Sequence, residues 1–311
     1  MYYEPRAWAR LKYLVKLRAR RACGVRLTDR IALLEAAPPR FRPFPGRWSR
    51  ISVLQSPGAM VCALTSFSPD VLYGLPSALL ESARMLQLMG ERLRLRAIFT
   101  SGELFHAGVR EALVNAYDAP VYHVYGGAET KEIAWECSDG GLHLNSDVVR
   151  LEALDYDGTP LPAGVEGELV ATVLVNRALP LLRYRTGDRG WLRDQSCTCG
   201  RAAPLVGVVT GREAEVLVLR GGQRVSPYAL TCALEQVSGV LRYQITQLSP
   251  AKVRVRAMVD LSQDRERVAG EIRAALQRGV APFLETEVEF VDCFPASSRA
   301  TFQVVQALGA T

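Results

Sequence analysis

The segment LRAIFTSGELFHAGVREALVNAYDAPVYHVY, residues 95–125, contains the alternation that decides the fold class. Residues 95–99 form an apolar run that predicts a strand, residues 106–117 have the spacing of an amphipathic helix, and residues 121–125 predict a second strand. Strands and helices that alternate at these lengths form βαβ units with a parallel sheet. Ligands of such sheets bind beyond the carboxyl ends of the strands, so the residues that follow each strand are candidate site residues.

The same alternation precedes this segment. We predict strands over residues 30–34 and 71–73 and a helix over residues 76–89, which has a proline near its first turn. Upstream of these elements, a basic first helix carries Tyr13 and Leu17 on the side that we expect to be packed, with its arginines and lysines on a solvated face.

A different pattern follows Ile133, where short strands separated by turns indicate an antiparallel subdomain. These strands are predicted over residues 148–154, 167–173 and 181–184. From Gly211 onward the order of elements is that of a separate α+β domain. We therefore predict an α/β protein. Residues 1–210 form a large domain, with a parallel βαβ sheet and the antiparallel subdomain, and residues 211–311 form a small, mobile α+β domain.

The composition excludes several classes of protein. The chain has 311 residues, of which 49% are hydrophobic and 23% charged, and a formal net charge of +6. No apolar run reaches the roughly 18 residues that span a bilayer, and the N-terminus has no signal-peptide core, so we expect a cytoplasmic protein without membrane contact. No nucleic-acid-binding motif accompanies the basic first helix, so we expect no nucleic-acid partner. The seven cysteines favour thiols and metal ligands over disulfides.

Three short segments follow predicted strands and carry groups suited to a nucleotide. They are Ser101-Gly102-Glu103, Tyr125-Gly126-Gly127-Ala128-Glu129 and Tyr184-Arg185-Thr186-Gly187-Asp188. The glycines let the backbone approach a base or a phosphate, Tyr125 offers a stacking face, and Glu129 offers a hard oxygen for Mg²⁺. The pattern places Asp188 on a tight turn after a strand, where a carboxylate accepts two hydrogen bonds from a ribose diol. A solvated turn aspartate is the alternative.

Four soft or borderline metal ligands lie in the antiparallel part of the sequence, namely Cys137, His143, Cys197 and Cys199. Three cysteines and one histidine suit tetrahedral zinc, and Cys199-Gly200 has the turn residue of a metal knuckle. The Cys-x-Cys spacing is tighter than usual for such sites. The alternative is that His143 is a packed histidine or a residue of a substrate pocket.

Five segments occur in the order that a known family shows. They are residues 70–77, 136–143, 179–188, 197–201 and 211–212. With the motifs above, they make the chain resemble adenylate-forming acyl-CoA ligases, and within them the phenylacetate–CoA ligase branch, over nearly its whole length. In that family, ATP and a carboxylic acid give an acyl-adenylate and pyrophosphate, and the thiol of coenzyme A then attacks the activated carbonyl. The resemblance implies an acid–thiol ligase that uses ATP, Mg²⁺ and coenzyme A on an aryl or related carboxylic acid.

The resemblance also implies roles for the site residues. Residues 101–103 would line the adenine pocket, and residues 125–129 would match the family's Tyr-Gly-x-Thr-Glu motif. Asp188 would hold the ribose hydroxyls, Arg212 would lie beside the ribose and the phosphate, and Glu129 would hold Mg²⁺. The branch shares the cysteine and histidine pattern, which supports structural Zn²⁺.

Three departures from the family pattern fall at the phosphate end of the substrate. No Ser/Thr/Gly-rich phosphate loop ending in lysine occurs, and residues 1–22 match the region just downstream of that loop. Thr301 stands where the family has its adenylation lysine, and Ala128 replaces the motif's threonine. A misplaced start codon or a truncated gene would explain the first departure but neither of the others.

We therefore expect a ligase-like protein whose adenylation is impaired, as in a pseudoenzyme. The alternative is a non-catalytic member of the family that binds AMP, an acyl-CoA or a partner protein. Whether the chain forms a homodimer or pairs with another subunit is left open by the sequence.

Overall fold

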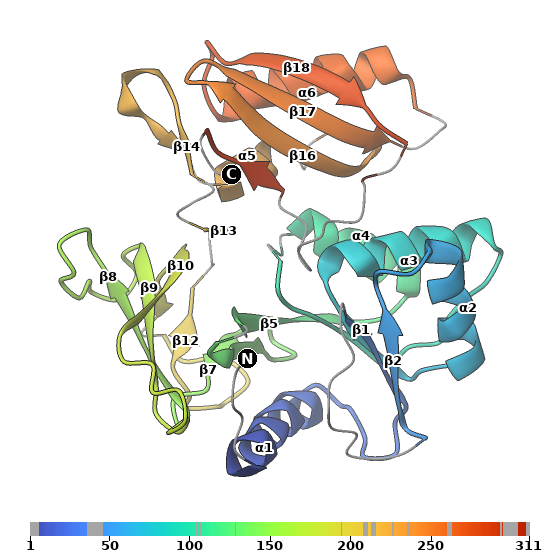
Figure 1. Cartoon of the computed structure of the whole chain (residues 1–311), viewed down its shortest axis with the longest axis vertical. Coiled ribbons are helices and arrows are strands. Elements are labelled where there is room, and N and C mark those ends of the chain that lie inside the picture. Colours follow the sequence, from blue (N-terminus) through green and yellow to red (C-terminus); the bar gives the residue numbers. More distant parts are fainter. Residues whose placement is uncertain are drawn as a thin grey trace. The chain divides into compact units, whose positions relative to one another are not determined.

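The computed structural model (Figure 1) describes residues 6–35, 46–103, 105, 107–127, 129–193, 195–207, 211–212, 216–225, 227–234, 237–259, 263–292, 294 and 304–308. The chain divides into two compact units. The first comprises Met1–Thr186 and Gly190–Val208, and the second comprises Gly187–Arg189 and Val209–Thr311.

A nine-stranded sheet forms the centre of the first unit, in the order β11-β12-β7-β6-β5-β4-β3-β1-β2. The parallel strands are β2 (Trp48–Ser52), β1 (Ile31–Glu35), β3 (Val71–Gly74), β4 (Ala97–Thr100) and β5 (Val121–Gly127). The antiparallel strands that continue the sheet are β6 (Lys131–Glu136), β7 (Leu142–Leu144), β12 (Leu205–Val206) and β11 (Leu192–Arg193). The change of direction falls between β5 and β6, at the predicted site segment 125–129.

Helices cover both faces of the parallel strands, because successive side chains of a strand point to opposite faces and both sets are apolar. Leu33 belongs to the core that includes residues of α1, whereas Leu34 belongs to the core formed with α2, α3 and α4. Figure 1 shows α1 apart from the other three helices. The helices are α1 (Arg6–Ala22), α2 (Pro57–Phe67), α3 (Pro76–Leu88) and α4 (Ala107–Tyr117).

Local sequence signals fix two of these helix starts. The Ser56 hydroxyl caps α2 by accepting a hydrogen bond from the Ala59 main-chain nitrogen (3.3 Å), and Pro57 occupies the first turn. Pro76 has the same place in α3, as its position in the predicted helix indicated. Both helices begin beside the sheet and pack their apolar residues against it.

The antiparallel strands β8 (Val149–Leu154) and β9 (Gly167–Val173) pair with each other, and β10 (Tyr184–Gly190) follows them in the chain. The strand predicted over residues 181–184 is wrong, because the observed strand begins where the predicted one ends. Arg183 has a φ of 46°, a left-handed conformation that interrupts extended backbone. Asp188 therefore lies within β10, and the prediction that it follows a strand on a tight turn is wrong as well.

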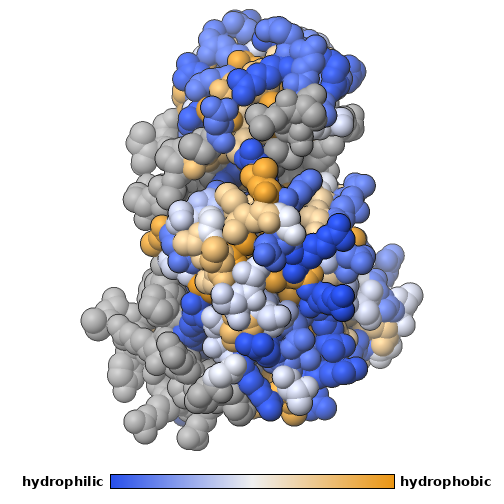
Figure 2. Space-filling model, turned by 90° about the vertical axis from the view of Figure 1, so that its right-hand side faces the viewer, coloured by the Kyte–Doolittle hydropathy of each residue, from blue (hydrophilic) through white to orange (hydrophobic). Residues whose placement is uncertain are grey.

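The second unit contains a four-stranded sheet in the order β18-β17-β16-β19. Its strands are β16 (Val240–Ser249), β17 (Lys252–Val259), β18 (Glu285–Phe290) and β19 (Val305–Gln306), and its helices are α5 (Pro227–Leu234) and α6 (Arg265–Gly279). Ile245, Val255 and Ile272 are fully buried in its core. Two short pieces, β14 (Leu217–Val218) and β15 (Arg224–Val225), form a hairpin, and β13 (Gly211–Arg212) pairs with Asp188 and Arg189. Figure 2 shows that the side of this unit facing the viewer is largely hydrophilic.

The predicted fold class is confirmed. The first unit has a sheet dominated by parallel strands together with antiparallel strands, and the second has an α+β order of elements. The mobility of the small domain and a boundary at residue 211 stay predictions. Among the helices of the described ranges, none combines the length and the apolar character needed to cross a membrane.

Candidate functional site

The carboxyl ends of β4 and β5 bring two predicted site segments to one edge of the sheet. The strands are parallel neighbours with Thr100 opposite His123, so residues 101–103 and the end of β5 leave the sheet at the same edge. The Glu103 carboxylate accepts hydrogen bonds from the Ser77 main-chain nitrogen (2.9 Å) and Oγ (2.8 Å). This contact fixes the segment to the first turn of α3, where the helix dipole favours a negative charge.

The end of β5 is a bulged hairpin that requires glycine. The register slips between Tyr125 and Gly126, and Gly126 lies opposite Glu132 of β6. A Cβ at Gly126 would collide with the main-chain carbonyl of Lys131. Because the atom that it meets belongs to the backbone and not to a flexible side chain, the collision could not be relieved by a change of rotamer. Tyr125 is only 6% exposed, whereas Gly127 is exposed and Gly126 and Glu129 are half-buried.

The other predicted nucleotide residues are described in part. A Cβ at Gly127 would lie 3.2 Å from the Glu129 carboxylate, which places that carboxylate beside the hairpin. Asp188 lies opposite Arg212 in the pairing of β10 with β13. Ala128 and the Arg212 side chain lie outside the described residues. The structure thus brings residues 101–103 together with the end of β5 in the first unit, and Asp188 together with the Arg212 backbone in the second.

The four predicted metal ligands also lie together. The ligand atoms of Cys137, His143, Cys197 and Cys199 are all within 4.8 Å of one another. The Cys137 and Cys197 sulfurs are 3.6 Å apart, and the Cys199 sulfur is 3.2 Å from His143 Nε2. They meet because β7, which carries His143, pairs with β6 on one side and with β12 on the other.

This donor set fits zinc, which takes four cysteine and histidine ligands in a closed tetrahedral site. His143 is fully buried yet directs Nε2 at a thiol, as a ligand would. A Cβ at Gly141 would lie 2.6 Å from the Cys197 sulfur, so glycine keeps room for the cluster. Desolvation would raise the pKa of the Cys199 thiol, but hydrogen bonds from Arg201 lower it to about 6. The thiolate favoured in this way is the form that binds metals.

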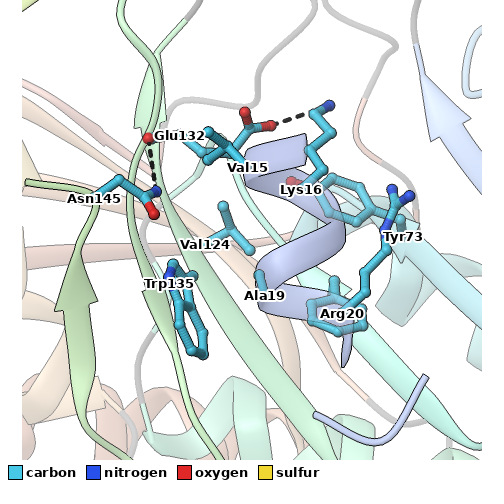
Figure 3. Close-up of a pocket in the computed structure, with 10 residues that line it drawn as sticks. Val15, Lys16, Ala19, Arg20, Tyr73, Val124, Glu132, Trp135 and Asn145 are labelled. Atoms are coloured by element: carbon cyan, nitrogen blue, oxygen red, sulfur yellow. Dashed lines mark hydrogen bonds and ion pairs between the residues drawn. The ribbon is translucent and has the colours of Figure 1, made fainter. Parts of the chain in front are cut away.

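A pocket that sequence analysis missed lies between α1 and the sheet (Figure 3). Its lining residues are Val15, Lys16, Ala19, Arg20, Tyr73, Phe99, Val124, Glu132, Trp135 and Asn145. Lys16 Nζ lies 3.0 Å from Glu132 Oε1 and 5.7 Å from the centre of the Tyr73 ring. The Glu132 carboxylate raises the pKa of Lys16 against the opposing effect of burial, so the ammonium group stays charged.

The packed side of α1 differs from the predicted one. Val15, Ala19 and Arg20 are buried, at 5%, 6% and 4% exposure, whereas Tyr13 and Leu17 are covered only in part. Burial lowers the pKa of Arg20, which lies among residues that were assigned to a solvated face. Lys16 and Arg20 are four residues apart, and charged residues with this spacing ordinarily lie on the solvated face of a helix. The sequence therefore indicated that this face of α1 is exposed.

Part of the chain is similar in sequence to known CoA ligases. No protein-family model matches the chain. The phenylacetate-coenzyme A ligase of Thermus thermophilus is 32% identical over 194 residues, which cover 60% of this chain and 43% of that one. The phenylacetate-coenzyme A ligase of Escherichia coli is 29% identical over 171 residues, covering 51% and 38%. The chain therefore matches about two fifths of the length of these curated relatives.

Solved structures show the same fold. A 2-hydroxyisobutyryl-CoA ligase in complex with 2-HIB-AMP gives a TM-score of 0.82 at 21% identity, covering 99% of this chain and 70% of that one. A benzoate CoA ligase from Burkholderia xenovorans gives 0.68 at 19% identity, covering 95% and 64%. The fold is that of the adenylate-forming CoA ligases. Within that class, the sequence similarity relates the chain to the phenylacetate–coenzyme A ligases, which confirms the resemblance predicted from its motifs.

Proposed function

We infer that the protein binds the acyl-adenylate of an aryl or related carboxylic acid and promotes its conversion to a coenzyme A thioester, with a weakened ability to form the adenylate from ATP. The observation that carries this proposal is the parallel register of β4 and β5, which brings residues 101–103 and the Gly126–Gly127 backbone to one sheet edge. Such an edge is where α/β sheets bind nucleotides.

The roles that we propose for the residues are those that the family resemblance implies. Residues 101–103 line the adenine pocket, and Glu103 fixes this segment to α3. The Asp188 carboxylate accepts the ribose hydroxyls, with Arg212 beside the phosphate. Glu129 is the hard ligand for Mg²⁺, which neutralises phosphate charge when bound. Loss of AMP rather than hydroxide from the carbonyl carbon makes attack by the coenzyme A thiol favourable.

Two sequence features support a weakened first step. Thr301 cannot place a positive charge at the α-phosphate and the carboxylate, and Ala128 removes a hydroxyl from the same neighbourhood. Both residues lie outside the described ranges. They also favour the second candidate function, a non-catalytic relative that binds AMP, an acyl-CoA or a partner protein. The two candidates differ in whether a supplied adenylate is consumed.

The discriminating experiment supplies the substrate at two points of the reaction. Purified protein is given either phenylacetate with ATP, Mg²⁺ and coenzyme A, or phenylacetyl-adenylate with coenzyme A, and the thioester is quantified by liquid chromatography. We expect thioester from the adenylate and little from the acid. Equal rates from both would refute weakened adenylation, and thioester from neither, with a broad panel of aromatic acids, would refute the ligase function.

A gain-of-function variant gives an independent readout. Thr301→Lys restores the cation at the position of the adenylation lysine, so it should raise acid-dependent exchange of pyrophosphate into ATP. Thr301→Val is the matched control, since it changes the same side chain without adding charge. An unchanged exchange rate in Thr301→Lys would show that this position does not limit adenylation.

A further inference from the structure

The Lys16–Glu132 ion pair lies beside the sheet edge formed by the carboxyl ends of β4 and β5, at which we infer that the nucleotide binds. Glu132 is the register partner of Gly126 across β5 and β6. Lys16 Nζ, 3.0 Å from Glu132 Oε1, also lies 5.7 Å from the centre of the Tyr73 ring. One ammonium group from α1 thereby meets the carboxylate of the residue that lies opposite Gly126.

Glu132 depends on this ammonium group. Its side chain is 12% exposed, and its second carboxylate oxygen, Oε2, is buried without a hydrogen-bond partner among the described residues. Its main-chain carbonyl is held separately, since it accepts a hydrogen bond from Asn145 Nδ2 (3.0 Å). A buried carboxylate that loses its partner moves toward water or becomes protonated, because an unpaired charge is costly to keep desolvated. Any such movement would act on β6 opposite Gly126.

We propose that Lys16 is a positioning residue for the sheet edge at which we infer that the nucleotide binds: through Glu132 it holds the Gly126 hairpin. This inference rests on the proposed function only in its consequence for ligands, because the positioning is a property of the protein without nucleotide.

The test uses Lys16→Met, which keeps the aliphatic stem and removes the charge. Lys252→Met in the second unit is the matched control, because Lys252 Nζ lies 3.0 Å from Glu285 Oε1 and its side chain is 30% exposed, against 36% for Lys16. Hydrogen–deuterium exchange of the whole chain without nucleotide is the readout, followed in peptides that cover residues 121–136.

In Lys16→Met we expect exchange over residues 121–136 to become about tenfold faster, with Lys252→Met unchanged there. A double variant separates positioning from simple loss of packing. Lys16→Met with Glu132→Gln leaves no unpaired charge, so it should recover most of the protection, although α1 has lost the same contact. Unchanged protection in Lys16→Met, or a double variant no better than the single one, would overturn the proposal.

Calorimetry with AMP on the same variants tests the consequence for ligands. We expect the Kd of Lys16→Met to rise about tenfold and that of the double variant to return toward wild type. If the wild-type protein does not bind AMP, the proposed function fails, whereas the exchange experiment still decides whether Lys16 positions the edge.

Discussion

Mild acid should destabilise the first unit through His123, a residue of β5 that precedes the Gly126 hairpin. Its ring stacks on Phe105 with 5.2 Å between centroids, and Nδ1 lies 3.4 Å from the buried Thr100 Oγ1. Burial, and then the Arg110 guanidinium, lower the pKa of His123 from 6.5 to about 4. The folded protein therefore keeps a neutral imidazole where the unfolded chain is already protonated.

The size and the sign of the effect follow from that difference. Since the unfolded state binds the proton more tightly, the contribution of His123 to the free energy of unfolding is complete above pH 6.5 and is lost as the pH falls toward about 4. One pKa unit corresponds to about 1.4 kcal/mol, so the loss is about 2 kcal/mol at pH 5. The whole lowering of the His123 pKa, from 6.5 to about 4, sets a ceiling of about 3.5 kcal/mol.

The assay compares wild-type protein with His123→Gln, which stays polar toward Thr100 but does not titrate. Urea unfolding of both proteins is measured at about pH 7.5 and about pH 5. For each protein this gives the fall in unfolding free energy between the two pH values, and the two falls are compared. We expect the wild-type fall to exceed that of the variant by about 2 kcal/mol. Equal falls would show that His123 is not held neutral by its surroundings, and would refute the reasoning.

Two further predictions concern the metal cluster and the hairpin. Elemental analysis should find about one zinc per chain, which the double variant Cys197→Ser, Cys199→Ser loses and Cys23→Ser retains. Zinc at wild-type level in the double variant would contradict the site. Gly126→Ala should lower the unfolding free energy by about 2 kcal/mol or more, because its Cβ meets a main-chain carbonyl of the facing strand. Gly58→Ala, in α2, has open space and should cost nothing measurable by the same denaturation.

Much of the parallel core could be predicted from the sequence because its strands and helices have local signals, although β2 and α2 were not predicted. Residues 95–125 contain apolar runs of strand length on either side of a helical spacing, and the observed β4, α4 and β5 follow that pattern. The metal cluster was predictable for a related reason, since cysteine and histidine are few and their grouping in one subdomain is informative. Both signals depend on residue type and spacing alone.

The charged pocket and the place of Asp188 could not be predicted, for different physical reasons. Lys16 is half-buried and paired because Glu132 meets it from a strand far along the chain, and nothing near Lys16 in sequence reveals that partner. Asp188 lies in β10, a strand that begins directly after the left-handed backbone of Arg183. Its partner across the pairing of β10 with β13 is Arg212. In both cases tertiary pairing decides the local structure.

The most direct test of the account is a calorimetric titration of the full chain with AMP. We expect wild-type protein to bind AMP with one site per chain, and Asp188→Ala to bind at least about tenfold more weakly, since a charged acceptor of two ribose hydroxyls is lost. Asp157→Ala, at an exposed turn, is the control and should bind as wild type does. Absence of binding in the wild type, or equal affinity in Asp188→Ala, would contradict the proposed nucleotide site.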